Sequence, residues 1–298
     1  MIDEIKDLAK QKNAVIMAHN YQNPEIQDIA DHTGDSLELA RIASQTKASI
    51  IVFCGVHFMA ESASILSPDK KVLLPDLSAG CPMADMIDAE KVRMLKKKHP
   101  DARVVTYINS TAEVKTVSDV ICTSSNARKI VDRIDSNEII FVPDKNLGSY
   151  VQRFTSKKII LSDGFCPTHE KFTVEMLRDV KAMHPDAYVI VHPECRPEVV
   201  DLADAALSTG EMVKFAATTD KKKVIVGTES ALIHRLKKAN PNIEFIPAGD
   251  SFICPNMKKI NLAKLLQSLR DEIYEVKIDI ETAALAKIPL DRMLELSY

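Results

Sequence analysis

The feature that most restricts the fold of this chain is an internal repeat. The tetrapeptide HPDA at residues 99–102 returns at residues 184–187, an interval of 85 residues. Three Cys-Pro pairs follow the same rhythm, since Cys81, Cys166 and Cys254 are separated by 85 and 88 residues. Similarity at a nearly fixed period indicates copies of one structural unit. A three-residue deletion in the second copy accounts for the change of interval.

Each copy contains three short runs rich in Val and Ile, which predict buried parallel strands. The predicted first strands are 14–18, 104–108 and 188–191, the second strands are 50–53, 139–142 and 224–226, and the third strands are 72–74, 159–161 and 244–246. Amphipathic patterns between them, such as 89–98 and 262–269, predict helices. We therefore expect an α/β fold of three homologous αβα sandwich units, with small parallel sheets around a pseudo-threefold axis.

The repeat also predicts the limits of the units. The first unit spans 14–102 and is preceded by an N-terminal helix at 1–13, the second spans 103–187, and the third spans 188–298 with a C-terminal extension. Sites on parallel sheets form at the carboxyl ends of the strands. We therefore expect the active site and any bound metal at the axis, where these ends meet.

Charge and the distribution of apolar residues exclude several classes of protein. The 39 Lys and Arg residues nearly balance 42 Asp and Glu residues, so no basic surface for nucleic acid is expected. The N-terminal residues alternate charged and apolar side chains, unlike a signal peptide, and no apolar run is long enough to cross a bilayer. We expect a cytoplasmic protein without a membrane partner, whose thiols stay reduced.

Three of the six cysteines align in the repeat and three do not. Cys54, Cys122 and Cys195 have no counterparts and are predicted to be small core side chains. Threefold packing would bring the thiols of the three Cys-Pro pairs together, and three thiolates suit zinc or an iron–sulfur cluster. His169 is a candidate fourth ligand for a closed zinc site. Three cysteines alone would leave one metal position open, as catalytic sites do.

Polar residues also align at the ends of predicted strands. A polar pair stands at the end of the first strand of each copy: His19 and Tyr21, Tyr107 and Asn109, His192 and Glu194. An Ala/Ser-Asp step comes next, and five residues after each Asp stands a hydroxyl: Ser36, Ser124 or Thr209. Hydroxyls at helix starts bind carboxylates and phosphates, although the same residues also suit helix capping. The acid/base candidates are His19, Tyr21, His192 and Glu194.

Nine segments carry a resemblance to a known family. They are 18–22 (AHNYQ), 34–37 (GDSL), 76–83 (DLSAGCPM), 107–111 (YINST), 123–127 (TSSNA), 143–147 (PDKNL), 191–195 (VHPEC), 208–210 (STG) and 254–258 (CPNMK). Over nearly the whole chain, the sequence resembles the quinolinate synthase (quinolinate synthetase A) family in its short archaeal/thermophilic type.

The resemblance implies an enzyme of de novo NAD biosynthesis that condenses iminosuccinate with dihydroxyacetone phosphate into quinolinate, phosphate and water. It implies a [4Fe–4S] cluster on Cys81, Cys166 and Cys254, with an open iron acting as a Lewis acid. Tyr21 and Glu194 correspond to the family's proton-transfer residues. The expected substrate-binding residues are His19, Ser36, Tyr107, Ile108, Asn109, Ser124, His192, Pro193, Glu194 and Thr209.

Two alternative functions remain open at this stage. In one, three thiolates and His169 hold zinc in a non-catalytic protein that senses a dicarboxylate. In the other, the cluster belongs to a hydratase that acts on a different small dicarboxylate.

Because iminosuccinate is unstable in water, a transient contact with the enzyme that supplies it is also expected.

Overall fold

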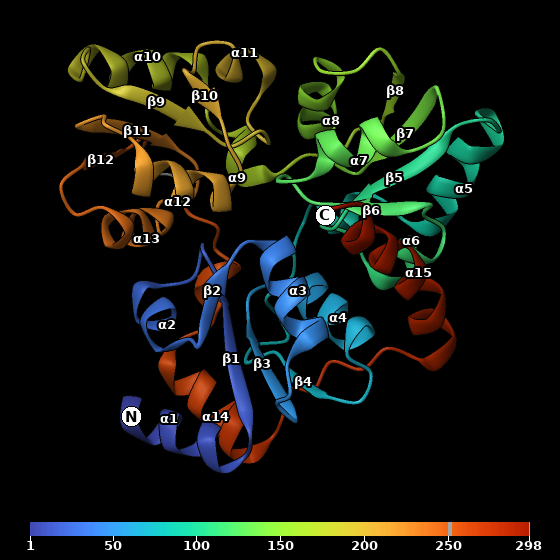
Figure 1. Cartoon of the computed structure of the whole chain (residues 1–298), viewed down its shortest axis with the longest axis vertical. Helices are drawn as coiled ribbons and strands as arrows, with labels where there is room; N and C mark the ends of the chain where they lie inside the picture. The colour runs from blue at the N-terminus through green and yellow to red at the C-terminus, as the bar shows by residue number, and fades with distance from the viewer. Residues whose placement is uncertain (250–251, 298) are drawn as a thin grey trace.

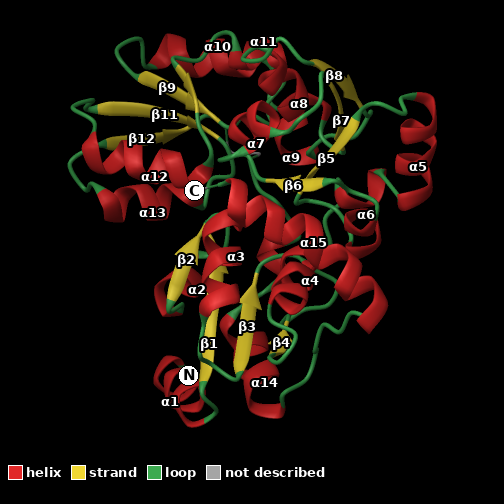
Figure 2. Cartoon of the chain, turned by 45° about the vertical axis from the view of Figure 1, so that its right-hand side comes forward, coloured by secondary structure: helices red, strands yellow, loops and turns green. Residues whose placement is uncertain are grey.

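The computed structural model describes residues 1–249 and 252–297. Its strands form three separate four-stranded sheets, and all strand pairs within them are parallel. Figure 1 shows the three sheets arranged around the centre of the molecule, and Figure 2 shows helices on both sides of the sheets. The predicted fold of three αβα units is confirmed, whereas the pseudo-threefold axis stays a prediction.

The three sheets have the same topology. The first contains β1 (Ala14–His19), β2 (His32–Gly34), β3 (Ile50–Cys54) and β4 (Lys71–Leu73); the second contains β5 (Arg103–Tyr107), β6 (Val120–Cys122), β7 (Glu138–Val142) and β8 (Lys158–Leu161); the third contains β9 (Tyr188–Val191), β10 (Ala205–Ala206), β11 (Lys223–Gly227) and β12 (Glu244–Pro247). In each sheet the first strand lies between the second and the third. The chain therefore places its second strand on one side of the first strand and its third strand on the other. In parallel sheets, the carboxyl ends of the strands beside such a switch in order form a binding crevice.

The short edge strands β2, β6 and β10 were not expected from the sequence. Each has two or three residues, too few to produce a recognisable apolar run. Each follows the Asp of an Ala/Ser-Asp step, whose carboxylate accepts a hydrogen bond from the first strand: Ile16 N to Asp31 at 2.8 Å, Val104 N to Asp119 at 2.7 Å, and Val189 N to Asp204 at 2.7 Å. The repeated Asp therefore has a structural role, fixing the chain beside the first strand.

The helices follow the predicted alternation with strands. In chain order they are α1 (Ile2–Gln11), α2 (Pro24–Ile29), α3 (Ser36–Gln45), α4 (His57–Leu66), α5 (Ala89–Lys98), α6 (Ala112–Thr116), α7 (Ala127–Arg133), α8 (Lys145–Gln152), α9 (Pro167–Glu170), α10 (Val174–Met183), α11 (Pro197–Val200), α12 (Thr209–Thr218), α13 (Leu232–Ala239), α14 (Leu262–Asp271) and α15 (Ile280–Leu296), with 3₁₀ turns at η1 (Ala84–Met86) and η2 (Met257–Lys259). Among the described helices, none combines the length and apolar character that crossing a membrane requires.

The C-terminal extension packs on the first and second units. Helix α14 contacts α1 and β3, and α15 contacts α4, α6, α7 and β6. Figure 1 shows these last helices, in orange and red, beside the blue first unit and the green second unit. The strands of the three sheets fall within 14–102, 103–187 and 188–298; as domain limits, these ranges stay a prediction.

Candidate active site

Loops from all three units line one cavity of about 160 Å³. Its lining includes Cys81, Cys166 and Cys254, together with the predicted site residues His19, Tyr21, Ser36, Tyr107, Asn109, Ser124, His192, Glu194 and Thr209. Two predicted substrate-binding residues, Ile108 and Pro193, are not among its lining residues. The side chain of Ile108 is buried in the hydrophobic core, so a substrate contact by Ile108 or Pro193 stays a prediction.

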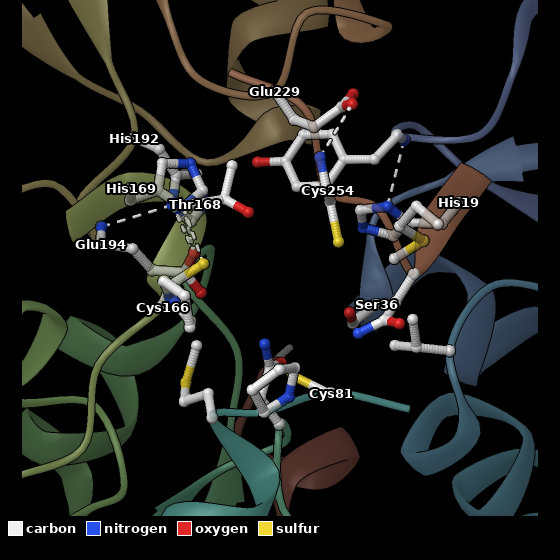
Figure 3. A pocket seen from close by; sticks show the side chains of 18 of the residues that line it. His19, Ser36, Cys81, Cys166, Thr168, His169, His192, Glu194, Glu229 and Cys254 are labelled. Carbon is white, nitrogen blue, oxygen red and sulfur yellow. Dashed lines mark hydrogen bonds and ion pairs between the residues drawn. The ribbon is translucent and has the colours of Figure 1, made fainter. Parts of the chain in front are cut away.

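The three aligned cysteines point into the same space (Figure 3). Each is half-buried and unbridged, and each lies in the segment after the last strand of its sheet, which is β4, β8 or β12. Burial raises the pKa of the Cys81 thiol to about 12, while the backbone N–H groups of Ala84 and Met83 act in the opposite direction. Burial likewise raises the thiol pKa values of Cys166 and Cys254.

These three side chains fit a metal centre. Thiolates are the form of cysteine that binds metals, and a nearby cation lowers the thiol pKa. Three buried thiols facing one cavity would stay protonated alone, whereas a bound cation would stabilise all three thiolates at once. The other cysteines lie elsewhere: Cys54 and Cys122 are buried in β3 and β6, and Cys195 is buried after β9. The prediction that they are core side chains is confirmed.

His169 adjoins Cys166 but is already bonded through both ring nitrogens. Its Nδ1 lies 3.2 Å from the Cys166 sulfur and 2.8 Å from Glu194 Oε2, and its Nε2 lies 2.8 Å from the Thr228 hydroxyl. The ligand atoms of Cys166, His169 and Glu194 all lie within 4.8 Å of one another, close enough to hold a metal ion. However, a metal bound to His169 would replace hydrogen bonds that this buried ring now makes.

Glu194 is the most highly connected group in the cavity. The Tyr107 hydroxyl donates to Glu194 Oε1 at 2.6 Å, and His169 donates to Oε2 at 2.8 Å. Burial alone would raise the pKa of Glu194, but the charge that His192 and His169 carry when protonated, together with the hydrogen bonds from His169 and the Tyr107 hydroxyl, outweighs it and holds this pKa below its ordinary value. At neutral pH, Glu194 is therefore an ionised carboxylate that can accept a proton.

A series of hydrogen bonds connects Tyr21 with Glu194. The Tyr21 hydroxyl lies 2.6 Å from the Thr228 hydroxyl, which lies 2.8 Å from His169 Nε2. A carboxylate only accepts, so His169 donates from Nδ1 to Glu194, and in the tautomer with its proton on Nδ1 it accepts from the Thr228 hydroxyl at Nε2. The direction of donation therefore runs from Tyr21 through Thr228 and His169 to Glu194. Burial, with Glu194 adding to it, raises the pKa of Tyr21 well above 10, so the phenol is protonated.

His19 and His192 occupy equivalent positions and bond in the same way. His19 Nδ1 accepts from the backbone N–H of Tyr21 at 3.1 Å, and His192 Nδ1 accepts from that of Glu194 at 3.3 Å. Burial lowers the pKa of His19 to about 4 and that of His192 to about 3. Both rings are therefore neutral at pH 7, and each keeps an Nε2–H donor. His192 Nε2 lies 3.2 Å from the Ser124 hydroxyl.

None of the three aligned hydroxyls caps a helix: Ser36 and Thr209 begin α3 and α12, and Ser124 lies three residues before α7, whose N-cap is Asn126. The cap of α3 is Asp35, whose carboxylate accepts from Glu38 N at 2.9 Å, and the cap of α12 is Ser208, which accepts from Glu211 N at 3.3 Å. Ser36 and Thr209 are the first helical residues instead. Helix capping therefore does not explain these two hydroxyls, and their position suits an anion.

The sequence reasoning missed Glu229, a buried cavity residue. Lys258 Nζ lies 2.8 Å from Glu229 and also donates to the backbone carbonyl of Tyr21 at 2.5 Å. A signal was present, because Glu229 lies 85 residues after Asp144, another buried acid that follows a strand at the corresponding place in its sheet. In both units the carboxylate stands two residues beyond the end of that strand, β7 or β11.

Comparisons with known proteins show which family the chain is similar to. The sequence profile of the family described as quinolinate synthetase A protein matches residues 3–295. Among similar proteins are quinolinate synthase from Geobacter sp. (strain M21), 52% identical over 98% of this chain and 96% of the relative, and quinolinate synthase from Caldicellulosiruptor bescii, 52% identical over 99% and 97%. Quinolinate synthase from Aquifex aeolicus is 52% identical over 99% of this chain and 93% of the relative.

Proposed function

Because this chain belongs to the quinolinate synthetase A family, we propose that it condenses iminosuccinate with dihydroxyacetone phosphate to form quinolinate, phosphate and water. Family membership identifies an enzyme of the quinolinate synthase type. The observation that carries the finer proposal is one cavity that combines three convergent thiols with neutral donors and a buried carboxylate, contributed by three separate units.

Cys81, Cys166 and Cys254 are the residues that would hold a [4Fe–4S] cluster. A three-cysteine cluster supplies an iron with an open position, which acts as a Lewis acid toward a substrate oxygen or nitrogen. The donor set supports this assignment, since three thiols face one cavity and the neighbouring histidine is bonded on both sides.

The proposed substrate-binding groups would hold the carboxylates of iminosuccinate and the phosphate of the second substrate. Ser36 and Thr209 offer hydroxyls beside the first free backbone N–H groups of α3 and α12. His19 and His192 add neutral Nε2–H donors. Such donors bind an anion without introducing a mobile proton, which leaves proton transfer to other residues.

Glu194 and Tyr21 are the proposed proton-transfer residues. As an ionised carboxylate, Glu194 takes a proton from the substrate, and Tyr21, as a protonated phenol, gives one from its hydroxyl. Return of a proton from Glu194 to Tyr21 through Thr228 and His169 requires the Thr228 hydroxyl to turn toward Tyr21 and His169 to carry its proton on Nε2 instead of Nδ1. Condensation followed by loss of water needs both a proton acceptor and a proton donor, and this pair supplies them.

Product analysis tests the proposed reaction. The protein, purified without oxygen, is incubated with iminosuccinate and dihydroxyacetone phosphate, and quinolinate and phosphate are measured by chromatography. We expect both products in equal amounts and neither when one substrate is omitted. Hydration of another dicarboxylate without any quinolinate would instead support the hydratase.

Metal content separates the proposed enzyme from a zinc-containing sensor. Anaerobic protein is expected to be brown and to contain iron and acid-labile sulfide in equal amounts. A colourless protein with one zinc per chain and no iron would contradict the proposed cluster and support a site that includes His169.

Alanine at Ser36, Ser124 or Thr209 is expected to weaken substrate binding. A hydrogen bond to a charged group contributes about 1.5–3 kcal/mol, so KM should rise roughly 10- to 100-fold with the cluster retained. Steady-state kinetics and thermal melting measure the two effects. Ser44→Ala is a matched control for Ser36, because Ser44 lies exposed on the same helix and donates to the Arg41 carbonyl. A lower melting temperature with unchanged KM would favour a purely structural role.

We also propose that the enzyme acts in the cytoplasm and receives iminosuccinate through a transient contact with the protein that makes it. The support is chemical, because an imine hydrolyses in water, so direct transfer would reduce the loss of iminosuccinate. A faster transfer of iminosuccinate than free diffusion allows, measured with a trapping reagent in solution, would test this contact.

A further inference from the structure

A buried side chain in the first unit holds the loop that carries Tyr21. Gln27, in α2, donates from Nε2 to the carbonyl of Asn20 at 3.2 Å and to that of Gln22 at 2.8 Å. These two carbonyls lie on either side of Tyr21. The same nitrogen is 3.0 Å from the carbonyl of Ala231 in the third unit, so Gln27 also joins this loop to its neighbour.

The second unit holds the loop of Asn109 in an equivalent way. Lys115, in α6, donates from Nζ to the carbonyl of Ile108 at 3.2 Å and to the carbonyl of Ser110. These carbonyls lie on either side of Asn109. In both units the acceptors lie seven and five residues before the donor, and Lys115 follows Gln27 by 88 residues, which is the interval of the repeat.

The third unit uses a different arrangement. The residue equivalent to Lys115 is Val200, which is buried and apolar. The backbone carbonyl of Glu194 instead accepts from Asn146 Nδ2 at 3.1 Å, and its carboxylate is fixed by Tyr107 and His169. In the first and second units, therefore, a buried side chain donates to the carbonyls that flank Tyr21 or Asn109. The side chains of Tyr21 and Asn109 themselves make fewer hydrogen bonds than the side chain of Glu194.

Burying the amide of Gln27 or the ammonium of Lys115 destabilises the fold unless these groups donate hydrogen bonds to the flanking carbonyls. Lys115 is completely buried, and an ammonium group in a protein core is strongly destabilising without hydrogen-bond acceptors. Gln27 is also buried, and its Oε1 has no hydrogen-bond partner within residues 1–249 and 252–297, because its Nε2 faces three carbonyls. An apolar residue such as Val200 would fill either position without these costs.

We propose that Gln27 and Lys115 are positioning residues, which set the place of Tyr21 and Asn109 in the cavity by fixing the carbonyls on either side of them. This inference rests on the proposed function, in which Tyr21 moves protons and Asn109 binds substrate. Neither Gln27 nor Lys115 lines the cavity, so each acts through the residue whose loop it holds.

A double-mutant cycle tests the action of Lys115 through Asn109. Lys115→Met is expected to raise KM about 10-fold, comparable to Asn109→Ala, and to add almost nothing in the Asn109→Ala background. Lys115→Gln, which keeps a donor of the kind found in the first unit, is expected to recover most of this loss. Additive losses in the double variant, or an unchanged KM in Lys115→Met, would overturn the proposal for Lys115.

The same cycle applies to Gln27 and Tyr21. Gln27→Leu is expected to lower kcat about 10-fold and to have almost no effect in the Tyr21→Phe background.

Lys157→Met is a matched control for both cycles, because Lys157 also donates to backbone carbonyls, those of Val131 at 2.7 Å and Asp132 at 3.0 Å, but lies outside the cavity. Its kinetics should equal those of the unsubstituted enzyme even if its melting temperature falls. Additive effects of Gln27 and Tyr21, or a kinetic loss in the control as large as in Lys115→Met, would overturn the proposal.

Amide hydrogen exchange provides a readout that does not depend on activity. Peptides covering 107–112 should exchange faster in Lys115→Met than in Lys157→Met, and Lys115→Gln should restore protection. If Lys115→Met does not fold, the comparison uses Lys115→Gln and Lys115→Ala, and unchanged exchange in both would contradict the positioning role. An Asn109→Ala variant with normal KM would instead count against the proposed function of Asn109 while leaving the exchange result valid.

Discussion

Serine in place of Cys81, Cys166 or Cys254 is expected to abolish the iron–sulfur cluster and, with it, all formation of quinolinate. Serine has nearly the volume of cysteine, but its hydroxyl is a far poorer ligand for iron than a thiolate. The other cysteines offer no substitute, because Cys54, Cys122 and Cys195 are buried and are not among the residues that line the cavity. Iron and sulfide analysis and the visible spectrum of anaerobically purified protein measure the loss.

Cys54→Ala and Cys122→Ala are the matched controls for this experiment. Both side chains are completely buried, so these variants should lose some stability while retaining iron, sulfide and activity. Full cluster content in Cys166→Ser would contradict the assignment of that ligand. Loss of the cluster in Cys54→Ala with an unchanged melting temperature would show that the repeat had been aligned wrongly.

The repeat predicted most of the fold because the residues that recur in it are the apolar side chains that pack within each strand. Buried parallel strands need Val and Ile, and runs such as 139–142 carry that signal directly. The edge strands β2, β6 and β10 could not be predicted in this way, because no apolar run defines them. Each is defined by its pairing with the first strand of its sheet and by the hydrogen bond that Asp31, Asp119 or Asp204 accepts from that strand. The packing of α15 on the first two units depends on contacts distant in sequence, which periodicity does not reveal.

The candidate site divides in a similar manner. Residues at equivalent positions of the three copies, including the three cavity cysteines, could be found because the same pattern of neighbouring residues recurs in each copy. The links among non-equivalent residues could not. Thr228 lies 207 residues from Tyr21 and 59 from His169, yet its hydroxyl bonds to both. Gln27 and Lys115 do occupy equivalent positions. However, glutamine and lysine are different residue types, and only the structure shows that both donate to equivalent backbone carbonyls.

Phenylalanine at Tyr21 and glutamine at Glu194 are each expected to lower kcat by about 100-fold or more, the usual effect of losing a general acid or base. Tyr21→Phe keeps the ring and its edge contact with His19, whose centroid lies 4.7 Å away, and removes the hydroxyl with its transferable proton and its hydrogen bond to Thr228. Glu194→Gln keeps the shape of the side chain and removes the charge that accepts a proton. Steady-state kinetics, with cluster content measured in parallel, separate these effects from loss of the metal centre.

The division between kcat and KM is the decisive part of this prediction. Substrate should still bind to both variants, because His19, His192 and the hydroxyl groups remain in place, so KM should change little. Asn109→Ala provides the contrast: it removes a contact made in both the ground state and the transition state and should act mainly on KM. An amide can hold a substrate but cannot carry its proton, whereas a phenol and a carboxylate can. If Tyr21→Phe turned over at the unsubstituted rate with only KM altered, Tyr21 would bind substrate as Asn109 does, and the proton for the condensation would have to come from another group in the cavity.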